Sequence, residues 1–138
     1  MPTYHPRSGS RGEHGAAMLE LALVAPLLML LVLGAVQFEL WYHAQGVVLA
    51  AAQDGARLAA AESGTASAGR QRALSLLRTG LGQTADSAVV DARRGPDVTV
   101  VSVTAELRPL LPVVGSLRLR ATGRSLTERF RAPVGGVP

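Results

Sequence analysis

Residues Leu21 to Phe38 read LALVAPLLMLLVLGAVQF, a stretch without a charged side chain. As a helix, about 18 residues rise ~27 Å, which is close to the hydrocarbon thickness of a bilayer. Pro26 lies inside the stretch, but a membrane helix tolerates an early proline because neighbouring groups satisfy the freed backbone carbonyl. The stretch therefore predicts one transmembrane helix, around which the rest of the 138-residue chain is organised.

The residues before this stretch predict its orientation. Arg7 and Arg11 precede it and are opposed only by Glu13. Such a basic flank stays in the cytoplasm by the positive-inside tendency. We therefore expect residues 1–15 to be a cytoplasmic basic leader, too polar to order by itself, and the chain beyond residue 40 to be extracytoplasmic.

A cleaved secretory signal is the alternative interpretation of the apolar stretch. The apolar core of such a signal runs for about 7–15 residues and ends at a small-residue cleavage site. Leu33-Gly34-Ala35 is a weak candidate for that site, and Ala50-Ala51-Ala52 has the right form but lies too far beyond the apolar core. Because the stretch exceeds the usual signal length, a membrane anchor is the better interpretation.

Composition argues against several classes of function. The chain is 48% hydrophobic but only 4% aromatic, so it lacks the rings that stack on nucleic-acid bases. Its net charge of +4 comes from arginines that are scattered among acids rather than clustered, which also argues against nucleic-acid binding. The absence of cysteine excludes disulfides and thiol catalysis.

Beyond the apolar stretch, an Ala-rich segment from Ala44 to Ala61 continues the helical pattern. One face combines apolar and small residues at spacings of three and four, and the opposite face is polar. We therefore expect one helix from about residue 17 to about residue 61, whose amphipathic second half needs a partner. The apolar face is Val47, Val48, Ala51, Gly55, Leu58 and Ala59, and the polar face is Gln45, Gln53, Asp54 and Arg57.

The remainder of the chain predicts a small α+β domain. Ser63-Gly64-Thr65 breaks the first helix, and a second helix is expected over Ala68 to Leu81, closed by Gly80 and Gly82. Strands are expected at residues 88–92, 97–106 and 117–122, with a turn at Gly95-Pro96. We expect two or three of these strands to pair antiparallel and to pack against the amphipathic helix.

Two details of the predicted strands remain open. The apolar phase shifts between Val100 and Val101, which indicates either a bulge or burial on both faces. Residues 108–112, Arg-Pro-Leu-Leu-Pro, cannot lie inside a sheet because proline has no backbone donor.

The polar residues do not form a recognisable chemical site. His5, His14 and His43 lack the spacing of metal ligands. Ser116 follows Gly115 but lacks the remaining residues of a nucleophile elbow. We therefore expect no enzyme activity, no cofactor, no metal and no small-molecule substrate.

Glu20 is an acid at the start of the apolar stretch, where a charge has a cost unless something compensates it. One explanation is local, because a carboxylate in a first helical turn complements the helix dipole. A second explanation is that Gly15, which stands immediately before Ala16, resembles the processing site of a prepilin, where a short basic leader is removed. A cut between them makes Ala16 the N-terminus, whose ammonium group the Glu20 of a neighbouring subunit can pair with in the membrane.

The order of these residues resembles that of the TadE-like family, which comprises minor pilins or pseudopilins of tight-adherence pilus systems. The chain departs from the family pattern at Leu21, where an aromatic residue is common, and at Gln37, where an acid is frequent. The matching features lie within residues 1–61 and are Arg11-Gly12, Gly15-Ala16-Ala17, Glu20, Pro26-Leu27-Leu28, Gln37-Phe38 and Asp54-Gly55-Ala56-Arg57.

The resemblance implies a processed membrane protein of the bacterial cytoplasmic membrane. A prepilin peptidase would remove residues 1–15, residues 16–61 would form the transmembrane helix and its exported extension, and residues 62–138 a small exported domain. Its partners would be other pseudopilins or the major pilin and the inner-membrane platform proteins of the pilus. The implied site residues are Gly15 and Ala16 for processing, Glu20 for assembly, and Pro26, Gly55, Ala56 and Arg57 for helix packing.

Two alternatives remain at this point. Asp54 and Arg57 also fit an ordinary surface ion pair at i, i+3, and Gly55 with Ala51 and Ala59 would let another helix approach closely. At the level of the whole protein, the alternative is an uncleaved single-pass anchor that holds an envelope-binding domain outside the membrane.

Overall fold

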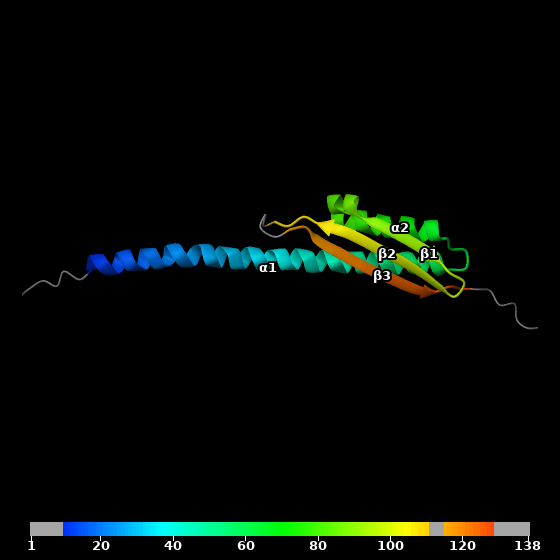
Figure 1. The fold of residues 1–138 in the computed structure, drawn as a ribbon, viewed down its shortest axis with the longest axis horizontal. Coiled ribbons are helices and arrows are strands. Elements are labelled where there is room, and N and C mark those ends of the chain that lie inside the picture. Colours follow the sequence, from blue (N-terminus) through cyan, green and yellow to red (C-terminus); the bar gives the residue numbers. More distant parts are fainter. Residues whose placement is uncertain (1–9, 111–114, 129–138) are drawn as a thin grey trace, which may run out of the picture. The chain divides into compact units, whose positions relative to one another are not determined.

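The computed structural model describes residues 10–110 and 115–128. It is α+β, as the sequence predicts (Figure 1). The chain forms two compact units, residues 1–36 and residues 37–138, and one helix contributes to both. The elements in chain order are α1 (Ser10–Ala60), α2 (Ala66–Leu81), the 3-10 helix η1 (Gly82–Ser87), β1 (Val89–Arg94), β2 (Val98–Leu107) and β3 (Leu117–Leu126).

The apolar part of α1 makes up the described portion of the first unit. From Met18 to Val36, every side chain except the half-buried Leu33 is exposed. Among the described residues, α1 is the one helix long and apolar enough to cross a membrane. Exposed apolar side chains in this number are stable against lipid rather than against water. The helix therefore supports a single-pass membrane anchor.

α1 begins at Ser10, earlier than the predicted start near residue 17. Residues 10–15 of the expected leader are therefore helical as an extension of the apolar stretch, while residues 1–9 lie outside the described residues. Adding a residue to an existing helix forms a hydrogen bond without a new nucleation step. The polar residues before the apolar stretch can therefore continue its helix.

The three predicted strands form one antiparallel sheet in the order β1-β2-β3. The predicted turn is present, since the Gly95 N–H donates to the Val98 carbonyl at 3.0 Å. Arg108, Pro109 and Leu110 lie outside the strands as expected, and residues 111–112 of that segment lie outside the described residues. Both β1 and β3 run further than predicted, and η1 was not predicted.

The bulge considered for β2 is wrong, because its register with β3 is continuous along both strands. Thr99 explains the change of apolar phase between Val100 and Val101. It occupies an inward position, fully buried, and its hydroxyl lies 2.9 Å from the Thr127 hydroxyl. Val100 is consequently on the other face of the sheet, where it is half-buried.

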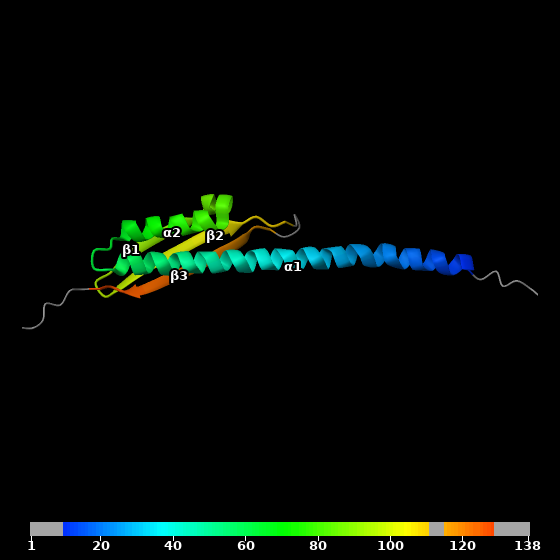
Figure 2. The ribbon, with the colours of Figure 1, turned by 180° about the vertical axis from the view of Figure 1, so that it is seen from behind.

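The core of the second unit lies between the sheet and the two helices, which run side by side over one sheet face (Figures 1 and 2). Small side chains dominate the contribution of α1, so sheet and helix approach closely. The largest fully buried side chains of this core are Leu77, Leu119, Val48, Val101, Val103 and Thr99.

The amphipathic half of α1 finds its partner in its own chain. α2 and the sheet cover the face of small side chains, so that face is not left for another subunit, and the oligomer inferred from it is not supported. Leu58, predicted to lie on the buried face, is 43% exposed. The buried residues of this half are Ala44, Val48, Ala51, Ala52, Gly55, Ala56, Ala59 and Ala60.

Candidate membrane and assembly site

The predicted processing and assembly residues lie in the N-terminal part of α1. Gly15 and Glu20 are exposed, and the bond from Gly15 to Ala16 lies inside the helix. Ala16 and Glu20 are four residues apart, so about one helical turn separates them. On adjacent subunits shifted by one turn, an amine at Ala16 and a carboxylate at Glu20 would lie at the same height.

The position at which α1 begins argues against the helix dipole as the explanation for the Glu20 carboxylate. Ser10 is about three helical turns before Glu20, and the effect of the helix dipole on a charge falls off within the first turn. The dipole therefore stabilises this carboxylate only in a helix that begins close to Ala16. A chain cleaved after Gly15 provides such a helix, whereas the full chain does not.

The predicted helix-packing residues fall into different environments. Pro26 is exposed in the first unit, and α1 continues through it. Gly55 and Ala56 are buried in the second unit, and Arg57 is exposed there. The structure therefore brings Gly55 and Ala56 to an internal contact and leaves Arg57 at the surface.

Gly55 lies at a close contact between α1 and α2. A Cβ at this position would lie 2.8 Å from the Gly69 carbonyl oxygen and 3.1 Å from the Ala73 Cβ. A Cβ at Gly69 would in turn lie 2.5 Å from the Gly55 carbonyl oxygen. Glycine on both helices is what allows their backbones to meet. The helix that packs on Gly55 is thus α2 of the same chain.

Asp54 forms an ion pair with Arg72 of α2 rather than with Arg57. The Arg72 Nε donates to Asp54 Oδ2 at 2.7 Å, and both side chains are partly exposed. The predicted i, i+3 pair is therefore wrong. The close packing at Gly55 brings α2 alongside, and Arg72 of that helix reaches Asp54. Exposed pairs of this kind contribute about 0.2–1 kcal/mol.

Arg94, at the end of β1, has a structural role that the sequence did not indicate. Its Nη1 donates to the carbonyls of Ala59 at 2.6 Å and Ala61 at 2.8 Å, and also to that of Gly64. The last carbonyls of a helix lack partners within the helix and carry its negative dipole end, so a cation there satisfies both needs. No local pattern predicts this contact, because Arg94 is 35 residues from Ala59.

Gln37, the first residue of the second unit, is buried and polar. Its side chain is 7% exposed, and its Oε1 accepts a hydrogen bond from the Leu110 N–H at 2.6 Å. Its Nε2 has no partner among the described residues. The amide therefore holds the segment after β2 against α1, at the point where the apolar stretch ends.

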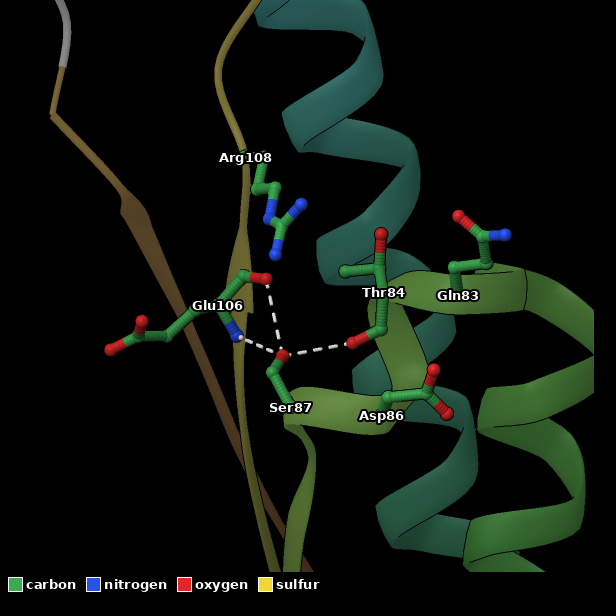
Figure 3. Close-up of a pocket in the computed structure, with 6 residues that line it drawn as sticks. All are labelled: Gln83, Thr84, Asp86, Ser87, Glu106 and Arg108. Carbon is green, nitrogen blue, oxygen red and sulfur yellow. Dashed lines mark hydrogen bonds between the residues drawn. The ribbon is translucent and has the colours of Figure 1, made fainter.

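A polar pocket of about 340 Å³ lies where η1 meets β2 (Figure 3). The Ser87 hydroxyl accepts a hydrogen bond from the Glu106 N–H at 3.0 Å and donates one to the Thr84 carbonyl oxygen at 2.8 Å. These hydrogen bonds of the hydroxyl therefore go to main-chain groups. The Glu106 carboxylate points to the opposite side of the strand from Arg108 (Figure 3). The Ser87 contacts thus connect η1 to β2, and no ion pair forms among the described residues that line the pocket. Its lining residues are Gln83, Thr84, Asp86, Ser87, Glu106 and Arg108.

Three arginines share the outer face of β3. Arg118, Arg120 and Arg124 are exposed and alternate with the buried Leu119, Ala121 and Gly123. The expectation that the arginines are scattered rather than clustered is therefore wrong for this strand, because every second residue of a strand faces the same way. Arg118 pairs in register with Glu106 of β2, which offsets part of the charge.

The family model described as TadE-like protein matches residues 15–57 of the chain. No curated protein matches the chain, and no solved structure matches it. The matched range begins at Gly15 and ends at Arg57, so it contains Glu20 together with the apolar stretch and most of the part of α1 that packs in the second unit. Residues 15–57 therefore match the TadE-like family, in agreement with the resemblance seen in the sequence, and the match covers less than half of the chain.

Proposed function

We propose that the protein is a minor pilin or pseudopilin that acts in the assembly of a tight-adherence pilus or a related secretion apparatus. The observation that carries this proposal is the match to the TadE-like family, whose matched range begins at Gly15. The matched range includes the apolar part of a helix with the length and composition of a membrane span. The work of the protein is accordingly assembly rather than chemistry.

The proposal includes cleavage after Gly15 by a prepilin peptidase on the cytoplasmic side of the membrane. Gly15 lies about one and a half turns from the start of α1, where helices fray. Glycine is also a weak helix former, so opening this segment for a peptidase has a low cost. Cleavage leaves residues 16–38 as the anchor in the bacterial cytoplasmic membrane, with the second unit on the outer side.

Glu20 then sets the register between subunits. In the low dielectric of the membrane, an ammonium group at Ala16 attracts the Glu20 carboxylate of a neighbour far more strongly than in water. An unpaired charge there has a cost, so each subunit favours a neighbour in the one position that pairs it. The neighbours are other pseudopilins or the major pilin, and the assembly would be handled by inner-membrane platform proteins.

The alternative is an uncleaved single-pass anchor whose outer domain binds a component of the envelope. The continuity of α1 from Ser10 favours it, because the end of the leader and the apolar stretch form one helix. In this case Glu20 carries no subunit contact.

Intact mass and N-terminal sequencing of membrane-extracted protein distinguish the two functions. We expect a mature chain that begins at Ala16. Gly15→Val should retain the leader, because a branched side chain obstructs the cut, whereas the matched variant Gly12→Val should be processed normally. A native protein that keeps its first 15 residues would contradict the proposal and support the uncleaved anchor.

Assembly is tested separately in sheared surface fibres. Glu20→Gln removes the charge with little change in shape, and we expect it to be inserted and cleaved but reduced about tenfold in fibres, which corresponds to ~1.4 kcal/mol. Glu39→Gln, outside the apolar stretch, is the control and should assemble normally. Equal assembly of both variants would rule out the role of Glu20.

A further inference from the structure

The membrane-facing end of the second unit is identified by Gln37. This residue stands at the end of the apolar stretch and is the first residue of the unit. At the opposite end of the same unit, the Glu128 N–H donates to the Ala60 carbonyl at 2.8 Å. β3 therefore runs away from the membrane boundary, and the end of β2, with Arg108 to Leu110 after it, lies at the boundary.

Leu110 is held at this boundary by a specific contact. Its N–H donates to Gln37 Oε1 at 2.6 Å, although the two residues are 73 positions apart in the sequence. Its side chain, by contrast, is 56% exposed. The buried Gln37 amide thus fixes the main chain of Leu110, while the Leu110 side chain stays exposed close to the end of the apolar stretch.

The neighbouring side chains on α1 have the character of a membrane interface. Phe38 is 63% exposed and Tyr42 is 65% exposed, and the Phe38 ring centroid lies 6.0 Å from that of Trp41 and 6.4 Å from that of Tyr42. Aromatic residues concentrate at the headgroup level of bilayers, where one part of the ring system is apolar and the other wet. Leu110 is therefore fixed close to the level at which lipid replaces water.

Arg108 adds a charge suited to the same surface. It is exposed, lies two residues before Leu110, and has no carboxylate within ion-pair distance among the described residues. Long arginine side chains reach from an apolar boundary to polar headgroups, and the guanidinium group binds phosphate oxygens with paired hydrogen bonds.

We propose that Leu110 and Arg108 form a second contact with the membrane in which α1 is anchored. The Leu110 side chain inserts at the boundary between headgroups and acyl chains, and Arg108 binds lipid phosphate. Together with α1, this contact gives the second unit two points of attachment and so restricts its rotation above the bilayer. The inference rests on the membrane anchor of the proposed function and not on cleavage after Gly15.

The experiment uses the absence of cysteine in the chain, which allows a single fluorophore to be placed by one substitution. The full chain carrying Leu110→Cys, labelled with an environment-sensitive dye, is reconstituted at a high lipid-to-protein ratio in phosphatidylcholine and phosphatidylglycerol vesicles. Quenching by nitroxide lipids is compared with quenching by aqueous iodide. Leu126→Cys, at the far end of β3 and 77% exposed, is the control for water, and Leu27→Cys is the control for the anchor.

We expect the dye at position 110 to be quenched by nitroxide lipids at least threefold more than the dye at position 126, and to be protected from iodide. Arg108→Gln should reduce this lipid quenching, whereas Arg124→Gln should not. Equal quenching at positions 110 and 126, with position 27 in lipid, would overturn the second contact and leave the anchor intact. A dye at position 27 that is open to iodide would overturn both the contact and the anchor of the proposed function.

Discussion

Gly123 has no side chain because the backbone of α1 lies where its Cβ would be. A Cβ built there would lie 2.1 Å from the Ala52 carbonyl oxygen. Contact with a backbone cannot be relieved by a rotamer change, so the strand would have to move away from the helix. The spacing between sheet and helix is thus set at this one residue.

We expect Gly123→Ala to lower the free energy of unfolding by about 1–3 kcal/mol. The measurement is urea unfolding of the full chain in detergent, followed by the fluorescence of the half-buried Trp41. Gly46→Ala is the control, because no atom lies within 4 Å of its Cβ position, and there alanine should stabilise the helix by up to about 1 kcal/mol. Equal effects of the two substitutions would show that β3 does not rest on α1.

Arg94 is the second residue with a testable role. Arg94→Met removes the donor from the end of α1 and should cost about 2 kcal/mol in the same measurement, the usual contribution of hydrogen bonds to a charged group. Arg94→Lys should be intermediate, because an ammonium group keeps the charge but not the planar fork. Arg93→Met, whose side chain is 83% exposed, should change stability by less than about 0.5 kcal/mol. A neutral Arg94→Met would refute the capping role.

At the scale of elements, α1 presents different surfaces to its own domain and to the outside. Ala56 is fully buried, whereas Leu58, two residues later, is 43% exposed. The periodicity of the sequence correctly predicts a buried face on this half of the helix but misplaces Leu58 at its edge. The face that remains available for another subunit is therefore the outer one.

Because Ala56 is buried and Leu58 is exposed, substitution of each by aspartate should give opposite results. Ala56→Asp buries an unpaired charge and should prevent folding of the second unit, at a cost of about 3–5 kcal/mol. Leu58→Asp should leave the free energy of unfolding within about 0.5 kcal/mol of the native value but lower incorporation into sheared fibres, because the exposed face of α1 is the one left for contact with another subunit. Normal incorporation of the Leu58→Asp protein would show that this position does not face a partner.

At the scale of the whole molecule, the second unit includes the last part of α1. The core formed by Leu77, Val101 and Leu119 lies against Val48 and the alanines of that helix. A domain that begins after the first helix, as the predicted boundary at residue 62 implies, would lack one wall of its core. Stability in so small a domain depends on that wall.

We expect a fragment of residues 37–138 to fold and a fragment of residues 62–138 to remain unfolded. Chemical-shift dispersion in amide correlation spectra and the presence of a cooperative thermal transition distinguish the two outcomes. Cooperative folding of the shorter fragment would mean that the sheet and α2 form a core without α1.

Apart from η1 and the exact ends of the elements, the sequence by itself determines which segments form helices and strands. The uncharged stretch, the spacing of small residues after it and the Val-Thr strands are local patterns, and local hydrogen bonding and side-chain periodicity decide those elements. The sequence features also indicated the resemblance to the TadE-like family, whose model matches residues 15–57, because these features follow one another within the N-terminal half of the chain.

Only the tertiary structure decides which side chains meet. Asp54 pairs with Arg72, which lies 18 residues further along the chain. Arg94 donates to the Ala59 carbonyl at the end of α1 across 35 residues, and Gln37 accepts from Leu110 across 73 residues. A periodic pattern states that a face is buried but carries no information about what covers it, since many partners have the same apolar character. That choice is made when the glycines at positions 55, 69 and 123 allow the backbones to approach, and it brings these distant polar groups within hydrogen-bonding distance.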